Sequence, residues 1–200
     1  MDIEKNFNLA SRHGKFNFKV MQVLKNQEDS EINSHSTKEA RQVYNWNRQV
    51  GGTYQRAREF ARLKISKFGI VYGKIEPEHY VEDLVARWFL SRFPLFTIMI
   101  ESPRGTFVVS KNSSLTVYKE KIEQLLPEFE KNQPENEILA DLEDFNDDEF
   151  WERYYDSQLI KERKNRRYFL HSIPKKFHNW ESLGLERRKF GKNKALSEFT

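Results

Sequence analysis

The longest apolar stretch of the chain lies between residues 76 and 130, and it also contains the clearest strand pattern. Pro77 and the acidic residues around it indicate the start of a helix, because proline suits the first helical position and carboxylates favour the positive end of the helix dipole. Pro94 is expected to end this helix. The apolar residues that recur at helical spacing between these prolines are Tyr80, Val81, Leu84, Val85, Trp88 and Phe89.

Two runs rich in β-forming residues follow, LFTIMI at 95–100 and TFVV at 106–109, with ESPRG between them. This pattern predicts a β-hairpin. Ser113 or Ser114 is suited to cap a second helix, and its apolar stripe would be Leu115, Tyr118, Ile122, Leu125, Leu126 and Phe129. The predicted fold class is α+β and mostly helical, with a helix–β-hairpin–helix core and extended N- and C-terminal segments.

The pattern divides the chain into four parts. They are an extended N-terminal segment (1–35), a helical core with the hairpin (36–132), an acidic-to-basic helical segment (133–170) and an extended wrapping tail (171–200). In the core, Ser36 and Glu39 form a capping-box pattern that predicts a helix start. Gly51 and Gly52 are predicted to break this helix from a second one that continues to about residue 68.

Composition favours a protein that contacts partners. Aromatic residues make up 14% and charged residues 32% of the 200 residues, and aromatic and arginine side chains are enriched in interfaces. The absence of cysteine excludes disulfides, cysteine-ligated zinc and cysteine nucleophiles. No apolar run reaches the roughly 18 residues that span a bilayer, so we expect no transmembrane segment, and the N-terminus has no secretory signal pattern.

The formal net charge is only +4, but the charged residues are clustered in blocks of one sign. Residues 41–74 contain eight Lys or Arg and one acid, residues 135–156 contain ten acids and only Arg153 as a base, and residues 157–200 are basic again. Basic clusters with aromatic neighbours are typical of nucleic-acid contact. The residues predicted to contact nucleic acid or a partner are Arg56, Arg58, Arg62, Lys64, Lys67, Trp88, Phe89, Arg163, Arg166, Arg167, Trp180, Arg187, Arg188 and Phe190.

Catalytic and cofactor motifs are not evident in the sequence. None of the five histidines stands at metal-ligand spacing from another, and no phosphate-cradling glycine motif or nucleophile elbow is present. We therefore expect no cofactor, no metal and no enzymatic activity. A metal-dependent nuclease remains a lesser alternative, with Glu82 or Asp83 on a helix and Glu101 and Lys111 on the hairpin, although Val109 occupies the position where such a site needs an acid.

A local resemblance covers residues 55–89. The segment YGKIEPEHYVEDLVARWF carries Tyr72-Gly73-Lys74, Tyr80, Glu82-Asp83, Arg87 and Phe89, and QRAREFARLKI precedes it. These residues resemble the S-twenty-three family of mitochondrion-specific proteins of the small ribosomal subunit, including its arginine-containing N-terminal helix. The chain lacks that family's proline-rich connection. The resemblance implies a non-catalytic subunit lodged on ribosomal RNA and neighbouring proteins.

The Lys-, Asn- and Phe-rich composition with an aromatic tail is also similar to accessory subunits of respiratory or ATP-synthase assemblies of protists. The favoured function is therefore a non-catalytic structural or accessory subunit of a large mitochondrial assembly, with protein subunits as partners and RNA as a further candidate. The alternative is an RNA- or DNA-binding protein that uses the basic helix and the tail. The expected location is mitochondrial or otherwise an intracellular, reducing compartment.

Overall fold

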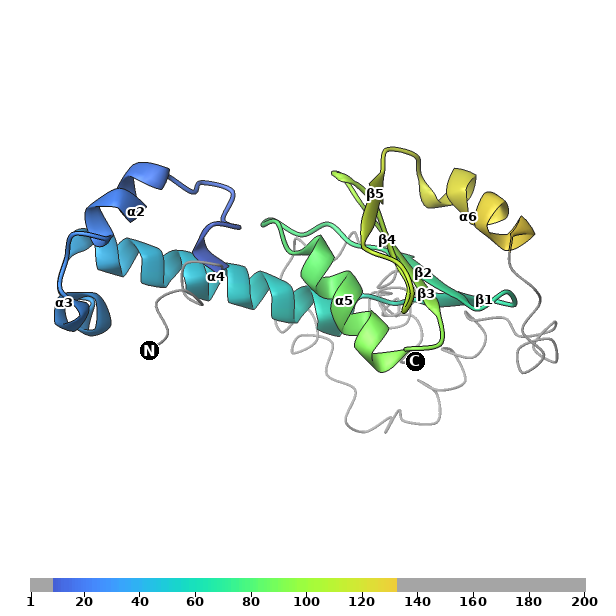
Figure 1. Cartoon of the computed structure of the whole chain (residues 1–200), viewed down its shortest axis with the longest axis horizontal. Coiled ribbons are helices and arrows are strands. Elements are labelled where there is room, and N and C mark those ends of the chain that lie inside the picture. The colour runs from blue at the N-terminus through green and yellow to red at the C-terminus, as the bar shows by residue number, and fades with distance from the viewer. Residues whose placement is uncertain (1–8, 133–200) are drawn as a thin grey trace, which may run out of the picture.

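The computed structural model describes residues 9–132 of the chain (Figure 1). A long helix, α4, runs from a small helical lobe at one end to a β-sheet at the other. The elements in chain order are α2 (Phe18–Leu24), α3 (Asp29–Ser34), α4 (Lys38–Phe60), β1 (Lys64–Ser66), β2 (Ile70–Lys74), α5 (Glu82–Arg92), β3 (Thr97–Ser102), β4 (Gly105–Val109), β5 (Thr116–Tyr118) and α6 (Ile122–Lys131).

The sheet has five strands in the order β1-β2-β3-β4-β5. β2 and β3 are parallel, and every other neighbouring pair is antiparallel. Because parallel strands need a crossover connection, α5 returns the chain from the end of β2 to the start of β3. The predicted β3–β4 hairpin is confirmed, with Ser102 paired to Gly105. The predicted helix–β-hairpin–helix core is wrong, because the hairpin is the middle of a mixed five-stranded sheet.

Two predicted helix starts are also wrong. The helix expected from Pro77 begins at Glu82, because residues 76–80 form a loop that other side chains hold in place. The helix expected from Ser113 or Ser114 begins at Ile122, because the intervening residues add strand β5 to the sheet edge. The backbone N–H of Ile122 donates to the carboxylate of Glu101 at 2.8 Å, which fixes the start of α6.

The predicted break at Gly51-Gly52 does not occur. Both glycines lie within α4, which is 23 residues long. Tertiary packing outweighs the low helix propensity of glycine, since Val50 and Ala57 are buried on either side of the pair. The side chain of Thr37, rather than that of Ser36, accepts from the N–H of Ala40 and caps the helix. The N-terminal part of the chain, predicted to be extended, contains α2 and α3 within its described residues.

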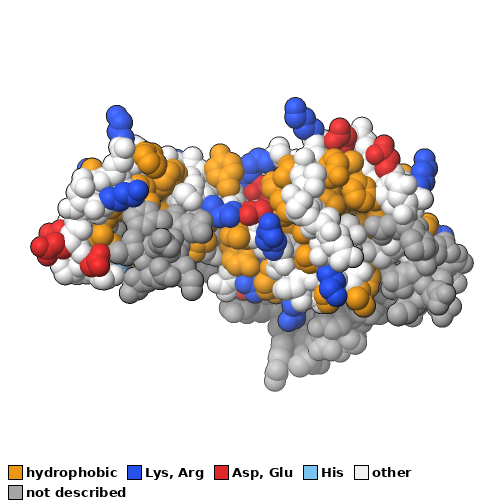
Figure 2. Space-filling view, in the orientation of Figure 1, with side chains coloured by type: hydrophobic (Ala, Val, Ile, Leu, Met, Phe, Trp, Pro, Cys, Tyr) orange, Lys and Arg blue, Asp and Glu red, His pale blue; other side chains and the backbone are white. Residues whose placement is uncertain are grey.

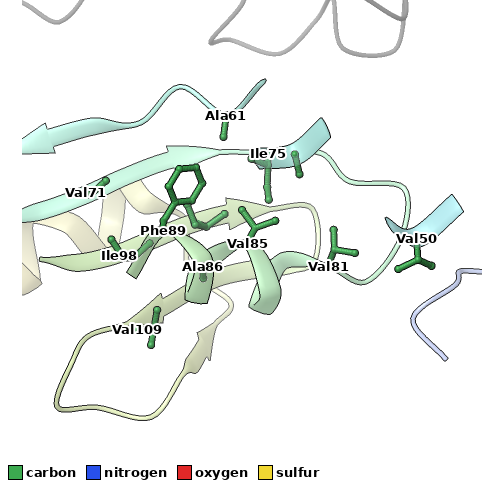
Figure 3. Close-up of a cluster of buried hydrophobic side chains, with 12 residues drawn as sticks. Val50, Ala61, Val71, Ile75, Val81, Val85, Ala86, Phe89, Ile98 and Val109 are labelled. Atoms are coloured by element: carbon green, nitrogen blue, oxygen red, sulfur yellow. The ribbon is translucent and has the colours of Figure 1, made fainter. Parts of the chain in front are cut away.

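The sheet has helices on both faces. Val71, Ile98, Ile100 and Val109 point to the face covered by α5 and the end of α4, where they join a cluster that includes Val85 and Phe89 (Figure 3). The alternate residues Ile70, Met99 and Val108 point to the other face, where they meet Ile122 and Leu125 of α6. A third cluster joins α2 to the first half of α4 through residues such as Leu24 and Trp46.

None of the helices in residues 9–132 has the length and apolar character needed to cross a membrane. The sequence predicted this absence, and for that part of the chain it is confirmed.

Candidate functional site

Two adjoining hollows lie along one face of α4. The first has a volume of about 470 Å³ and is lined by Asn45, Arg48, Gln49, Gly52, Thr53, Arg56, Glu78 and His79. The second has a volume of about 420 Å³ and is lined by His13, Lys15, Lys38, Arg41, Gln42, Asn45, Trp46 and Gln49. Because Asn45 and Gln49 line both hollows, the two form one continuous groove, here called the α4 groove.

The α4 groove is strongly cationic. Lys38, Arg41, Arg48 and Arg56 line it from one side of the helix, and at 1.5 Å of rise per residue they extend over about 27 Å of its length. Lys15 adds a fifth cation from the segment before α2. Among the described residues that line the groove, Glu78 is the single acid. Figure 2 shows Lys and Arg side chains where the helical lobe meets the sheet, with Asp or Glu side chains between them.

The wall opposite α4 includes the loop between β2 and α5, which brings Glu78 and His79 to the groove. This loop follows the carboxyl end of β2, the strand that pairs in parallel with β3. The guanidinium of Arg104 holds the loop in place by donating to the carbonyl oxygens of Pro77 and His79, both at 2.9 Å. The groove is therefore pre-formed on this side.

The segment before α2 is fastened to the same loop. Arg12 donates to both carboxylate oxygens of Asp83, at 2.5 and 2.9 Å, and to the carbonyl oxygen of Tyr80 at 3.0 Å. In return, the backbone N–H of Tyr80 donates to the carbonyl oxygen of Arg12 at 3.0 Å. A bidentate arginine–carboxylate pair fixes geometry as well as distance, so the two segments form one wall.

Two buried histidines sit inside this wall. The Nδ1 atom of His13 accepts the backbone N–H of Lys15 at 3.0 Å. A neutral imidazole that accepts at Nδ1 carries its proton on Nε2, so His13 donates from Nε2 to the Oε1 atom of Gln49 at 2.8 Å. This hydrogen bond joins the wall to α4 and orients the amide of Gln49. The ring of His79 packs against that of His13, with centroids 4.2 Å apart.

Gly52 forms part of the groove surface on α4. A methyl group at this position would lie 3.8 Å from the guanidinium of Arg56, an ordinary contact distance. Alanine would therefore fit, but its methyl group would occupy groove space and cover the helix backbone. A glycine in a helix interior costs about 1 kcal/mol relative to alanine, and the contacts within the structure do not require glycine at this position.

The structure separates the residues predicted to bind nucleic acid or a partner. Arg56 lines the groove. Arg58 lies outside the groove lining, with its guanidinium carbon 4.2 Å from the ring centre of Trp88, and Trp88 is half-buried. Phe89 belongs to the core and is only 7% exposed.

The remaining predicted residues of the basic helix do not lie on α4. Arg62 follows its end and donates to the carbonyl oxygen of Glu59 at 3.0 Å. Lys64 is on β1 and Lys67 follows that strand, and both are exposed. The predicted residues Arg163, Arg166, Arg167, Trp180, Arg187, Arg188 and Phe190 lie outside the described residues.

Arg56 was predicted, but the other groove residues were missed by the sequence interpretation. Arg41, Asn45, Arg48, Gly52 and Arg56 follow one another at intervals of three or four residues, which places them on one face of a continuous helix. Because the helix was predicted to break at the two glycines, the residues on either side of them were assigned to two separate helices and their common face was not recognised. Lys15, His13 and His79 come from other segments, and no local pattern marks them.

The acidic residues of the nuclease alternative have structural partners. The carboxylate of Glu82 pairs with Arg104, and that of Asp83 pairs with Arg12. Glu101 accepts the N–H of Ile122 near the turn of the hairpin, whereas Lys111 lies beyond its open end, so the strands place them about 15 Å or more apart. In residues 9–132 no group of three or more potential ligands is placed to hold a metal ion.

Comparison with known proteins identifies a family. No curated protein and no solved structure matches the chain. The model of DUF4130, described as a domain of unknown function, matches residues 12–183 and so includes every residue that lines the α4 groove. Since this match covers most of the 200 residues, the chain belongs to the DUF4130 family.

Proposed function

We propose that the chain binds nucleic acid along the α4 groove. The observation that supports this proposal is the set of five cationic side chains around two adjoining hollows that contain a single acid. Phosphate groups supply most of the affinity of a nucleic acid for such a surface, because each neutralised phosphate releases condensed counterions.

The length of the groove favours a polymer over a small anion. Cations at Lys38 and Arg56 stand about 27 Å apart along the helix, too far to hold one phosphate between them. The amides of Asn45 and Gln49 lie between the cationic ends and offer both donors and acceptors. A row of charges with neutral hydrogen-bonding groups between them matches a chain of phosphates that carries bases.

The test is the affinity of the full chain for a fluorescently labelled oligonucleotide, measured by anisotropy at several salt concentrations. The double variant Arg48→Ala/Arg56→Ala is expected to bind at least tenfold more weakly and to lower the salt slope by about two. The control Lys64→Ala/Lys67→Ala removes the same charge from exposed positions outside the groove and is expected to bind within about twofold of the wild type.

An equal loss of affinity in the two double variants would contradict the proposal, because affinity would then depend on the total charge of the protein rather than on the charges in the groove. Absence of salt-dependent binding to any oligonucleotide would also contradict it.

A second candidate function, an accessory subunit of a large assembly, has support from another surface. The guanidinium carbons of Arg58 and Arg92 lie 4.2 and 5.5 Å from the ring centre of the half-buried Trp88. Leu95, in the segment between α5 and β3, is 80% exposed. Aromatic residues flanked by arginine are common at the centres of protein interfaces. Sedimentation of this chain in a gently prepared mitochondrial lysate, with and without ribonuclease, would test this function and the mitochondrial location together. Migration as a free chain of about 24 kDa would contradict it.

A further inference from the structure

We infer that the α4 groove takes its nucleic acid as an unpaired single strand, with one base read by Asn45 and Gln49. This inference rests on the proposed function and names the substrate class of the same site. Three features support it: the concave shape of the groove, the fixed position of its walls, and the amides at its centre.

The first feature is shape. Proteins that read a duplex insert a protruding helix or ribbon into a major groove about 12 Å wide. Here the cationic face of α4 instead forms one side of two hollows of about 470 and 420 Å³, with Lys15 and His79 on other segments around them. Each volume lies in the range of small-molecule pockets. Hollows of this size suit individual nucleotides of a flexible strand better than a stiff duplex.

The second feature is the fixed wall. To admit a duplex, the groove would have to open by moving the loop at residues 76–80 away from α4. Arg104 and Arg12 bind three backbone carbonyl oxygens of this loop, and both are paired to carboxylates of α5. Movement of the loop alone would break these contacts together, and movement of the whole wall would break the hydrogen bond from His13 to Gln49 of α4. The groove is therefore built to receive a strand at its present width.

The third feature is the pair of amides shared by the two hollows. The Oε1 atom of Gln49 accepts from the buried ring of His13, which leaves the N–H donors of the amide on the side away from that ring. Asn45 is exposed and lies one helical turn earlier. Amide side chains form paired hydrogen bonds with base edges. In a single strand the Watson–Crick edge is accessible to them, whereas in a duplex the partner base occupies it.

Cations lie along α4 on both sides of Asn45, and Arg48 lies directly beside Gln49. Lys38 and Arg41 line the hollow towards the start of α4, and Arg48 and Arg56 line the hollow towards its end. Phosphates on either side of a central nucleotide would meet one pair each. A positively charged groove that follows the backbone of a strand is one of the two usual features of single-strand binding proteins, the other being aromatic side chains on which bases stack.

The experiment compares a labelled 12-nucleotide single strand, as DNA and as RNA, with the blunt duplex of the same sequence, all titrated with the full chain at several salt concentrations. The single strand is expected to bind at least tenfold more tightly than the duplex. Asn45→Ala is expected to weaken single-strand binding three- to tenfold, to reduce the difference in affinity between strands of different bases, and to leave the salt slope unchanged. Its side chain is exposed, so the fold is retained.

Gln49→Ala is also expected to weaken single-strand binding. Gln55→Ala, on the same helix but outside the groove lining, is the matched control and is expected to bind like the wild type. Equal or tighter binding of the duplex would overturn the inference while leaving the proposed function standing. An unchanged affinity in Asn45→Ala and Gln49→Ala would overturn the role of the amides. Failure of both nucleic-acid forms to bind would overturn the inference and the proposed function together.

Discussion

The imidazole rings of His13 and His79 lie 4.2 Å apart between their centroids, and each side chain is less than a tenth exposed. His13 precedes α2, whereas His79 lies in the loop between β2 and α5. Their contact joins two segments that are distant in sequence into one wall of the α4 groove. His13 also packs against Trp46 of α4, with ring centres 5.6 Å apart. Both sides of the groove therefore meet at this buried pair.

The two adjacent glycines of α4 provide a test that separates binding from stability. Gly52 lines the groove, whereas a methyl group at Gly51 would have no other atom within 4 Å. Either glycine replaced by alanine is expected to raise the free energy of unfolding by up to about 1 kcal/mol, because alanine has the higher helix propensity. Gly52→Ala is also expected to weaken nucleic-acid binding severalfold, whereas Gly51→Ala is not.

Thermal denaturation and anisotropy measured on the same preparations check this prediction. A Gly52→Ala protein that is more stable and binds as well as the wild type would show that no ligand approaches the helix backbone here.

The ion pair between Lys74 and Glu123 predicts a small pH dependence of stability. Lys74 Nζ lies 2.5 Å from Glu123 Oε1, and this hydrogen bond lowers the pKa of the Glu123 carboxyl. Because the pKa is lower in the folded state, the pair stabilises the fold above the pKa of an unfolded glutamate. The stabilisation is lost as pH falls through the lowered value. With Glu123 61% exposed, solvent screening limits the effect to less than about 1 kcal/mol.

Carboxyl titration by NMR is the direct measurement for Glu123. Lys74→Ala is expected to bring its pKa back towards the ordinary glutamate value. High salt is expected to have the same effect in part. A Glu123 titration that does not respond to Lys74→Ala would mean that the pair does not form in solution.

The β3–β4 hairpin was predictable because its signals are local. A run of β-forming residues, a turn containing Pro103 and Gly105, and a second such run follow one another directly. Gly105 has a φ of +131°, and a methyl group there would lie 2.6 Å from the carbonyl oxygen of Tyr118. The neighbouring strand thus explains why the turn needs glycine, although the sequence indicated the turn without that strand.

The rest of the sheet could not be predicted because its pairing is not local. β1 and β5 contain three residues each, too few to show an alternating pattern. The parallel pairing of β2 with β3 depends on α5 crossing between them. In the candidate site, too, only the features with a local sequence signal could be predicted. The basic character of the helix around Arg56 was visible, whereas the contributions of Lys15 and His79 depend on tertiary contacts.

Two isoleucines in the sheet test the assignment of its buried face. Ile100 on β3 is fully buried in the cluster beneath α5, whereas Ile65 on β1 is 43% exposed. Ile100→Ala is expected to lower the free energy of unfolding by about 2–5 kcal/mol, the usual cost of a buried isoleucine truncation. The same truncation at Ile65 is expected to cost less than about 1 kcal/mol. Chemical denaturation measures both. Similar costs at the two positions would contradict the arrangement of the sheet.

The buried carboxylate of Glu82 makes the loop at the groove dependent on Arg104. Glu82 is only 2% exposed, and it accepts from Nε of Arg104 at 2.5 Å and from the hydroxyl of Ser102 at 3.0 Å. Arg104→Ala removes one partner and leaves the charge buried, which is expected to cost about 3 kcal/mol of folding free energy. The variant also removes the hydrogen bonds that Arg104 donates to the carbonyl oxygens of Pro77 and His79, although the His79 oxygen still accepts the backbone N–H of Val81. Nucleic-acid binding is therefore expected to weaken, although Arg104 lies outside the groove lining.

The double variant Glu82→Gln/Arg104→Ala separates the two consequences, and denaturation and anisotropy measure them. Neutralising the buried carboxylate is expected to restore part of the lost stability, because the charge no longer needs a partner. Binding is expected to remain weak, since the loop has not regained its hydrogen bonds from Arg104. If the double variant were as unstable as Arg104→Ala, the cost would lie in the loop contacts rather than in the buried charge. If it bound as well as the wild type, the loop would not set the width of the groove.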